Sequence, residues 1–232
     1  MQLTRPAVSL AAATAATAAT ALLLAGCGGG EDGPSKSGNI EGADSPKSTS
    51  PSADKSEEAE PKTGDFRTSD IKLPDDVKLV FDWKQPSDPD KAAALDGAAD
   101  YMRALMHGTV KQDPKDPVLA RHVVPLQTAE EYATTLVKAH VEREATVTGT
   151  DRYYRENVGD VVSGKLAEVS FCVDQSKFYS KKIKSGKIKR TEKSASSYMR
   201  YTLVMEKPKR AASPWRARSF EYEAKAVKQC GD

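Results

Sequence analysis

Residues 177–193 form a strongly basic stretch of the chain, and binding of anions is the chemistry that its side chains suggest. The stretch carries eight Lys or Arg side chains and a single acid. Ser185 and Gly186 at its centre suit a two-residue hairpin turn, and pairing outward from this turn places Lys182 opposite Lys189. Like charges that face each other across two strands are destabilising. We therefore expect the hairpin to be better ordered against an anionic surface than alone.

The function that this pattern favours is contact with anionic lipid headgroups or cell-wall phosphate polymers, because each Lys or Arg near anionic lipid contributes about 1 kcal/mol. The alternative is a solvated charged loop without a partner. Nucleic acid is not expected, since no aromatic-glycine recognition motif accompanies the basic residues. The residues expected to make the contact are Lys181, Lys182, Lys184, Lys187, Lys189 and Arg190.

Few residues suggest catalysis. His140 lies near the apolar face of a helix expected to begin at Thr128, where it could point into a cavity as an acid or base. The alternative is a core or rim histidine whose hydrogen bonds are satisfied by the fold. The chain has no His-Glu-x-x-His motif, no cysteine cluster for zinc, no Gly-rich phosphate loop and no Gly-x-Ser-x-Gly elbow. We expect no metal and no cofactor, and His140 is the one candidate for a catalytic residue.

The N-terminal segment predicts export. Residues 1–26 begin with one cation, Arg5, continue through an Ala- and Thr-rich apolar stretch and end in small residues, as in a secretory signal. A single transmembrane helix is the alternative, but the segment is short of the roughly 20 strongly apolar residues that a span needs. Leu24-Ala25-Gly26-Cys27 resembles the lipobox of bacterial lipoproteins. The resemblance implies cleavage before Cys27, a diacylglyceryl anchor on its sulfur, and a place on the extracytoplasmic face of the cell membrane.

The remaining two cysteines, Cys172 and Cys230, are expected to form a disulfide in an oxidising compartment. One geometric condition applies. If both lay on strands separated by a third, their Cα atoms would be about 9 to 10 Å apart, too far to bridge. The bond therefore requires Cys230 to lie beyond the end of its strand.

Composition divides the mature chain into a tether and a domain. Residues 27–69 are rich in Gly, Ser, Pro and charged residues and hold almost no large apolar side chain, so they cannot bury enough surface to fold. Residues 28–65 carry a net charge of −5, and the rest of the mature chain carries +6. We predict a disordered acidic linker over residues 27–69 and a basic globular domain over residues 70–232. As a flexible coil, the linker would reach roughly 35 Å.

Within the domain, the spacing of apolar residues changes after residue 143. Before it the patterns are mixed, and after it apolar and polar residues alternate strictly. Alternation of apolar and polar residues predicts strands. Apolar residues at helical spacing that follow an N-cap residue predict helices. Asp88 is the expected N-cap of a first helix, and Thr128 to Glu131 read as a capping box. The expected elements are a strand at 77–83, helices at 89–108, 116–124 and 128–143, and long strands at 146–157, 161–173, 198–206 and 215–229.

Helices followed by long antiparallel strands predict an α+β fold in which helices cover one face of a strongly curved sheet. Residues 88–230 resemble the nuclear transport factor 2-like family, the cone-shaped α+β domains found also in lipoproteins of high-GC Gram-positive (actinobacterial-type) bacteria. The resemblance rests on the order of the elements, the final strands and the two cysteines. It implies a cone whose mouth holds a ligand or whose sheet meets a partner. Its aromatic walls would come from Tyr153 or Tyr154, Tyr198 or Tyr201, Trp215 and Tyr222, unless these rings form ordinary sheet core.

Three functions fit this pattern. The first is a binding or interaction module anchored to the membrane by its lipid, with the envelope or another envelope protein as partner and without enzymatic activity. The second is a small enzyme of the isomerase or hydratase kind that uses the cone cavity. The third is a structural or assembly factor at the cell surface. Fold alone does not choose between them.

Overall fold

The computed structural model describes residues 69–210 and 213–231. The predicted signal peptide, the predicted anchor residue Cys27 and most of the predicted linker lie outside these described residues. The elements run in the order β1 Val77–Asp82, α1 Pro89–Lys111, α2 Pro117–His122, α3 Thr128–Glu142, β2 Ala145–Val158, β3 Leu166–Lys182, β4 Ile188–Lys189, a 3₁₀ turn Ala195–Ser197, β5 Tyr198–Glu206, β6 Arg216–Ala224 and α4 Val227–Cys230.

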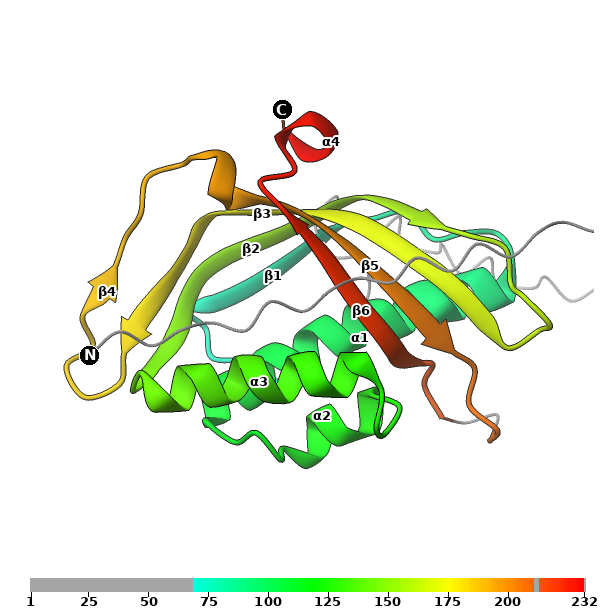
Figure 1. The fold of residues 1–232 in the computed structure, drawn as a ribbon, viewed down its shortest axis with the longest axis horizontal. Coiled ribbons are helices and arrows are strands. Elements are labelled where there is room, and N and C mark those ends of the chain that lie inside the picture. Colours follow the sequence, from blue (N-terminus) through cyan, green and yellow to red (C-terminus); the bar gives the residue numbers. More distant parts are fainter. Residues whose placement is uncertain (1–68, 211–212, 232) are drawn as a thin grey trace, which may run out of the picture. The chain divides into compact units, whose positions relative to one another are not determined.

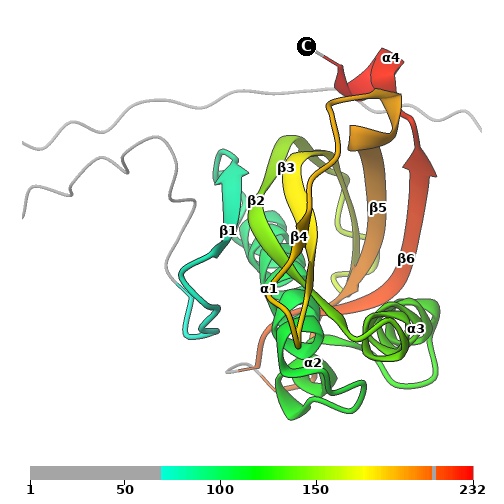
Figure 2. The ribbon, with the colours of Figure 1, turned by 90° about the vertical axis from the view of Figure 1, so that its left-hand side faces the viewer.

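The strands form one strongly curved sheet in the order β1-β2-β3-β5-β6, with the short β4 attached to β3. Figure 1 shows α1, α2 and α3 on the concave side and α4 on the convex side. Seen from the β4 end in Figure 2, the sheet curls around α1. The predicted α+β fold, helices on a curved sheet that forms a cone, is therefore confirmed. One pairing differs from the expected antiparallel sheet, because β1 runs parallel to β2.

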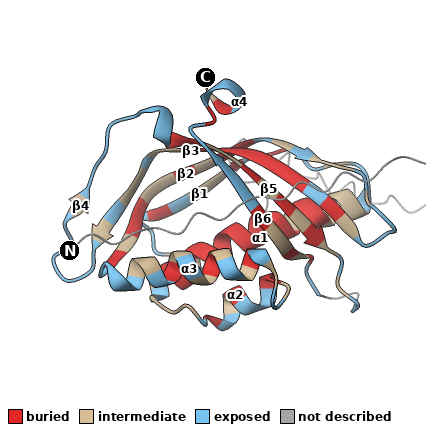
Figure 3. Cartoon of the chain, viewed as in Figure 1, coloured by how far each residue is buried: buried red, intermediate tan, exposed pale blue. Residues whose placement is uncertain are grey.

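The core lies between α1 and the concave face of the sheet. The buried residues of Figure 3 follow α1 and the inward positions of the strands. Phe81, Tyr153 and Phe171 are almost completely buried there, and the rings of Phe81 and Tyr153 stack with their centroids 4.7 Å apart. Aromatic side chains bury the largest areas of any residues, so this cluster fixes how the first three strands pack on α1.

Helix boundaries match the sequence patterns in part. Asp88 caps α1, as predicted, by accepting hydrogen bonds from the backbone of Asp90 and Lys91. The expected end at Gly108 is wrong, because α1 continues to Lys111 and ends where Gln112 adopts a left-handed conformation. Gly108 instead lies where α1 passes Val137 of α3.

The capping box at Thr128 is also wrong. Gln127 is the N-cap of α3 and its side chain makes no capping bond. The Glu130 carboxylate instead accepts from the backbone N–H of Leu126.

The strands differ most from expectation at their ends. The second long strand was expected at 161–173, but β3 begins at Leu166 and continues to Lys182. The last strand was expected to reach residue 229. It stops at Ala224, because Lys225 turns the chain through a left-handed conformation into α4.

The disulfide between Cys172 and Cys230 is present, with the Cα atoms 5.4 Å apart. Strand β5 separates β3 from β6, and Cys230 lies beyond the end of β6 in α4, so the geometric condition set by the sequence is met. The bond holds α4 against the convex face in a small buried cluster with Tyr154 and Tyr198. The Tyr154 hydroxyl also donates to the backbone carbonyl of Cys230.

Candidate functional site

A cavity of about 330 Å³ lies between α3, α1 and the concave face of the sheet. Six of the described elements contribute to its wall: α1, α3, β2, β3, β5 and β6. Most of the lining is apolar or aromatic, with a few polar groups among it. The lining residues are Met102, Leu105, Met106, Tyr132, Leu136, His140, Val147, Gln175, Phe178, Tyr179, Ser180, Met199, Tyr201 and Tyr222.

An irregularity in the pairing of β2 and β3 creates the outer half of this wall. Thr150 pairs with Lys177 and Arg152 with Asp174, so β3 carries one extra residue between these pairs. A bulge of this kind exchanges the faces to which later side chains point. Phe178 and Ser180 therefore lie on the concave face.

Gly149 is the register partner of Phe178. Its φ is +102°, and a Cβ there would overlap the backbone carbonyl oxygen of Lys177. Glycine is therefore needed at this position, because only glycine combines this backbone conformation with so close an approach. It lets β3 pass close to β2 where the cavity wall begins.

Polar groups lie at several points of the apolar wall. Burial raises the pKa of Tyr132 to about 12 and that of Tyr201 well above its usual value, so both rings present neutral hydroxyls. Burial lowers the pKa of His140, and its Nδ1 atom is buried without a hydrogen-bond partner among the described residues. Neutral donors and acceptors in an apolar cavity orient a ligand without requiring it to be charged.

A buried carboxyl lies beneath the wall. Asp151 is completely inaccessible to solvent. One of its oxygens accepts hydrogen bonds from the Tyr153 hydroxyl at 2.6 Å and the Gln175 side-chain amide at 3.2 Å, and the other has no partner among the described residues. Burial raises the pKa of Asp151 to about 7. Asp151 does not line the cavity itself, and Gln175 connects the two.

Asp151 was not among the residues singled out from the sequence. A signal for it existed, because Val147, Gly149, Asp151 and Tyr153 share the inward face of one strand. A charged residue on an otherwise apolar face is the unusual position in such a pattern.

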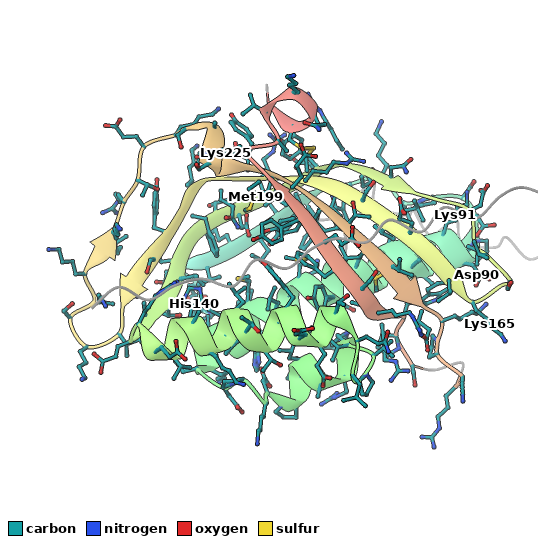
Figure 4. The ribbon with its side chains drawn as sticks, in the orientation of Figure 1. Asp90, Lys91, His140, Lys165, Met199 and Lys225 are labelled. Carbon is teal, nitrogen blue, oxygen red and sulfur yellow. A yellow bond between two sulfur atoms is a disulfide. The ribbon has the colours of Figure 1, made fainter. Side chains whose placement is uncertain are left out.

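His140 does line the cavity, near the C-terminal end of α3 (Figure 4). The expectation that this face of the helix turns inward is met at Ala133 and Val137, which are buried. The role of His140 as an acid or base stays a prediction.

The aromatic residues expected to wall the cone divide between four places. Tyr201 and Tyr222 line the cavity. Tyr153 is buried in the core beneath it, and Tyr154 and Tyr198 lie on the opposite, convex face beside the disulfide. Trp215 is buried beside a second, larger hollow.

That second hollow, of about 1020 Å³, has a wall in which charged and polar side chains are prominent, including Asp90, Asp96 and Lys207. It also includes Ser69 and Ser213, which adjoin parts of the chain outside the described residues. The cavity under α3 is therefore the better-defined candidate site.

The basic hairpin has a different register from the one expected. Ser180 pairs with Lys189, and Lys181 pairs with Ile188. The predicted pairing of Lys182 with Lys189 is therefore wrong. The connection between β3 and β4 covers residues 183–187, and in it the backbone N–H of Ile183 donates to the carbonyl of Glu144, just beyond the end of α3.

The six candidate basic residues fall into two groups. Four have partners within the domain: Lys181 pairs with Asp76 at 2.8 Å, Lys184 with Glu144 at 2.6 Å, Lys182 donates to the carbonyl of Arg143 at 2.7 Å, and Arg190 lies over the ring of Tyr179. Lys187 and Lys189 are exposed and make no ion pair with a described residue. These two are therefore the cations most available to an external anion.

Comparison with known proteins gives distant structural neighbours and no family. No protein-family model matches the chain, and no curated protein matches it. A ketosteroid isomerase-like protein from Erwinia carotovora atroseptica SCRI1043 is 10% identical with a TM-score of 0.38, covering 59% of this chain and 97% of that one. A candidate ketosteroid isomerase from Shewanella frigidimarina NCIMB 400 is 14% identical with a TM-score of 0.32, covering 58% and 98%. The class that the fold defines is a cone-shaped α+β domain with a cavity on its concave face.

Two further observations concern membranes and metals. Among residues 69–210 and 213–231, no helix is long and apolar enough to cross a bilayer. The same parts of the chain hold no cluster of three or more His, Cys, Asp or Glu side chains placed to bind a metal ion.

Proposed function

We propose that the protein is a binding module, held at the extracytoplasmic face of a cell membrane by lipid on Cys27, whose cone cavity takes up a small and mostly apolar molecule. The observation that carries this proposal is the cavity itself. Its volume of about 330 Å³ lies at the lower end of the roughly 300 to 1,000 Å³ range of ligand pockets. Its wall has the composition of such pockets, apolar and aromatic with few polar groups.

The location is proposed from the sequence. Residues 1–26 have the features of a secretory signal, and Leu24 to Cys27 resemble a lipobox. Mass spectrometry of the protein isolated from its own cells tests this proposal. The expected N-terminal fragment starts at Cys27 and carries the mass of a diacylglyceryl group. A fragment that starts at Met1, with an unmodified Cys27, would contradict it.

Filling the cavity from α3 is expected to abolish binding. Leu136 lines the cavity and is partly exposed to it, so Leu136→Trp would place a large ring in the space a ligand needs. We expect the affinity for an apolar fluorescent probe to fall at least about tenfold, because the lost contacts of even two methylene groups amount to about 1.6 kcal/mol. Fluorescence titration of the full chain measures this change.

Thr135→Trp is the matched control, because Thr135 precedes Leu136 on the exposed face of α3. It adds a ring of the same size to the same helix and is expected to leave probe affinity unchanged. Equal affinity in both variants would show that the probe binds elsewhere and would contradict the proposal.

An isomerase- or hydratase-like enzyme is the second candidate function, and the buried carboxyl of Asp151 favours it. A carboxyl with a pKa of about 7 is suited to exchange protons near neutral pH. Binding is the better-supported function, because Gln175 lies between Asp151 and the cavity.

Incubation with a small ketone in deuterium oxide distinguishes the two functions. An enzyme of this kind would exchange the protons next to the carbonyl group, and Asp151→Asn would stop the exchange. A binding module would exchange none above the rate in buffer.

The basic hairpin is proposed to contact anionic components of the envelope when the anchor holds the domain near the membrane. Replacing Lys182, Lys184, Lys187 and Lys189 by Gln is expected to reduce co-sedimentation with anionic liposomes at least about tenfold, since each lysine contributes about 1 kcal/mol. The measurement uses the full chain with Cys27→Ser, so that no lipid of its own contributes. Unchanged sedimentation would defeat this part of the proposal.

The structural or assembly role has no surface feature in its favour. The large apolar side chains that are exposed are Leu126, Val141, Val162, Ile183, Tyr222 and Val227. They lie on six different elements or loops of the described chain, and singly exposed apolar residues are normal on protein surfaces.

A further inference from the structure

The ligand of the cavity has a chemical class that the surrounding charges specify. We propose that it is a single-chain anionic amphiphile, with its hydrocarbon chain in the cavity and its carboxylate or phosphate at Lys189 and Lys182. This inference rests on the proposed binding function and adds the charge and the length of the ligand.

The register of the hairpin places Lys189 beside the cavity. Ser180 lines the cavity and is paired directly with Lys189 across the antiparallel ladder. Residues paired in this way project from the same face of a sheet, with Cβ atoms about 5 Å apart. Lys189 therefore shares the concave face with Ser180 and Phe178, and its exposed side chain leaves the sheet next to Ser180 of the cavity wall.

A second cation lies on the same face. Lys182 follows Ser180 by two residues on β3, so both side chains point to one side of the strand. Its ammonium group donates to the carbonyl of Arg143 just beyond the end of α3. This contact holds Lys182 at the same end of α3 as His140.

The acids close to this end of the cavity do not neutralise the two lysines. Glu144 pairs with Lys184, and Asp76 pairs with Lys181 on the other face. Asp151 is buried and hydrogen-bonded to Tyr153. Lys189 makes no ion pair with a described residue, so an apolar cavity and an uncompensated positive charge lie side by side.

The volume of the cavity sets the length of the chain it holds. About 330 Å³ is roughly eleven times the 30 Å³ that a water molecule occupies in the liquid. Because a methylene group is of similar size, a chain of about ten to twelve carbons fills the space. The phenol and imidazole groups in the wall lie among apolar side chains, so the wall accepts a hydrocarbon chain.

The experiment is a calorimetric titration of the full chain carrying Cys27→Ser with dodecanoate, dodecyl phosphate and dodecanol. We expect the two anions to bind at least about tenfold more tightly than the neutral alcohol. Within a series of carboxylates, each added methylene group is expected to tighten binding about fourfold up to about twelve carbons and little beyond.

Two variants separate the charge from its position. Lys189→Gln is expected to weaken dodecanoate binding about fivefold, from the roughly 1 kcal/mol that one lysine contributes near an anion, and to leave dodecanol binding unchanged. Lys228→Gln removes the same charge from α4, which lies on the opposite, convex side of the sheet. It is expected to change neither affinity.

Three outcomes are possible, and each is decisive. Preference for the anions together with loss in Lys189→Gln alone supports the inference. Equal binding of dodecanoate and dodecanol, or equal losses in Lys189→Gln and Lys228→Gln, overturns the anionic class and leaves the cavity as an apolar binding site. Failure of all three compounds to bind overturns the inference together with the proposed function.

Discussion

The contribution of the buried carboxyl of Asp151 to the free energy of unfolding is expected to fall by about 4 kcal/mol as the pH rises from about 4 to about 8. Its pKa in the folded chain is about 7, against 3.8 in the absence of structure. Each unit of this difference is worth about 1.4 kcal/mol. Between the two values the folded chain holds a proton that the unfolded chain has lost, so the stability that is complete below pH 4 is lost as the pH rises through 7.

Urea denaturation at a series of pH values measures this slope. Asp151→Asn is expected to remove most of it, since the amide stays neutral throughout. Asp75→Asn, an exposed residue near the start of β1, is the control and should keep the slope of the parent chain. A slope that persists unchanged in Asp151→Asn would contradict the assignment.

Loss of the disulfide is expected to lower the free energy of unfolding by about 4 kcal/mol. The bond closes a loop of 58 residues, and the chain-entropy model gives this magnitude for a loop of that length. The double variant Cys172→Ala with Cys230→Ala isolates the effect from the choice of reductant. Its midpoint in urea, compared with that of the parent chain, gives the measurement.

The disulfide and the cavity lie on opposite faces of the sheet, so their roles separate. Figure 1 shows α4 and α3 on opposite sides of the sheet. The bond joins β3 to α4, whereas the cavity lies between α3, α1 and the sheet. The double variant should therefore bind ligand normally under conditions where it is fully folded. A stability loss below about 1 kcal/mol, or a loss of binding in the folded variant, would show that this division is wrong.

The sequence predicts most of the fold because its local signals agree with the tertiary structure. Alternation at Val77 to Trp83 and at Tyr198 to Glu206 corresponds closely to β1 and β5. Asp88 before Pro89 predicts the start of α1 correctly. Each of these signals depends on neighbours within a few residues, which a single sequence contains.

The features that escaped prediction depend on contacts between distant residues. The bulge in β3 opposite Thr150 changes which face Phe178 occupies, and no local pattern specifies it. The hairpin contains a backbone contact between Ile183 and Glu144, which are 39 residues apart, and its register does not follow from the local turn residues alone. The cavity depends on both, so its existence could be expected from the fold class, but its lining could not.

The candidate residues also divide into those that local sequence signals reveal and those that depend on distant contacts. His140 could be placed in the cavity wall from helical periodicity, and Cys172 with Cys230 could be paired by elimination. Asp151 required knowledge that its strand is buried on that face. Lys189 could be distinguished from the neighbouring cations only from the structure, which shows that Lys181 and Lys184 form ion pairs within the domain.

An NMR titration of the methyl-labelled full chain, carrying Cys27→Ser, with dodecanoate tests the central claim most directly, because it reports where the hydrocarbon chain lies. Leu105, Leu136 and Val147 each present methyl groups to the cavity. The account predicts that their signals shift and show direct contacts with the protons of the ligand chain. Contacts confined to Val118, which lines the larger hollow, or no methyl contacts at saturating ligand, would contradict it.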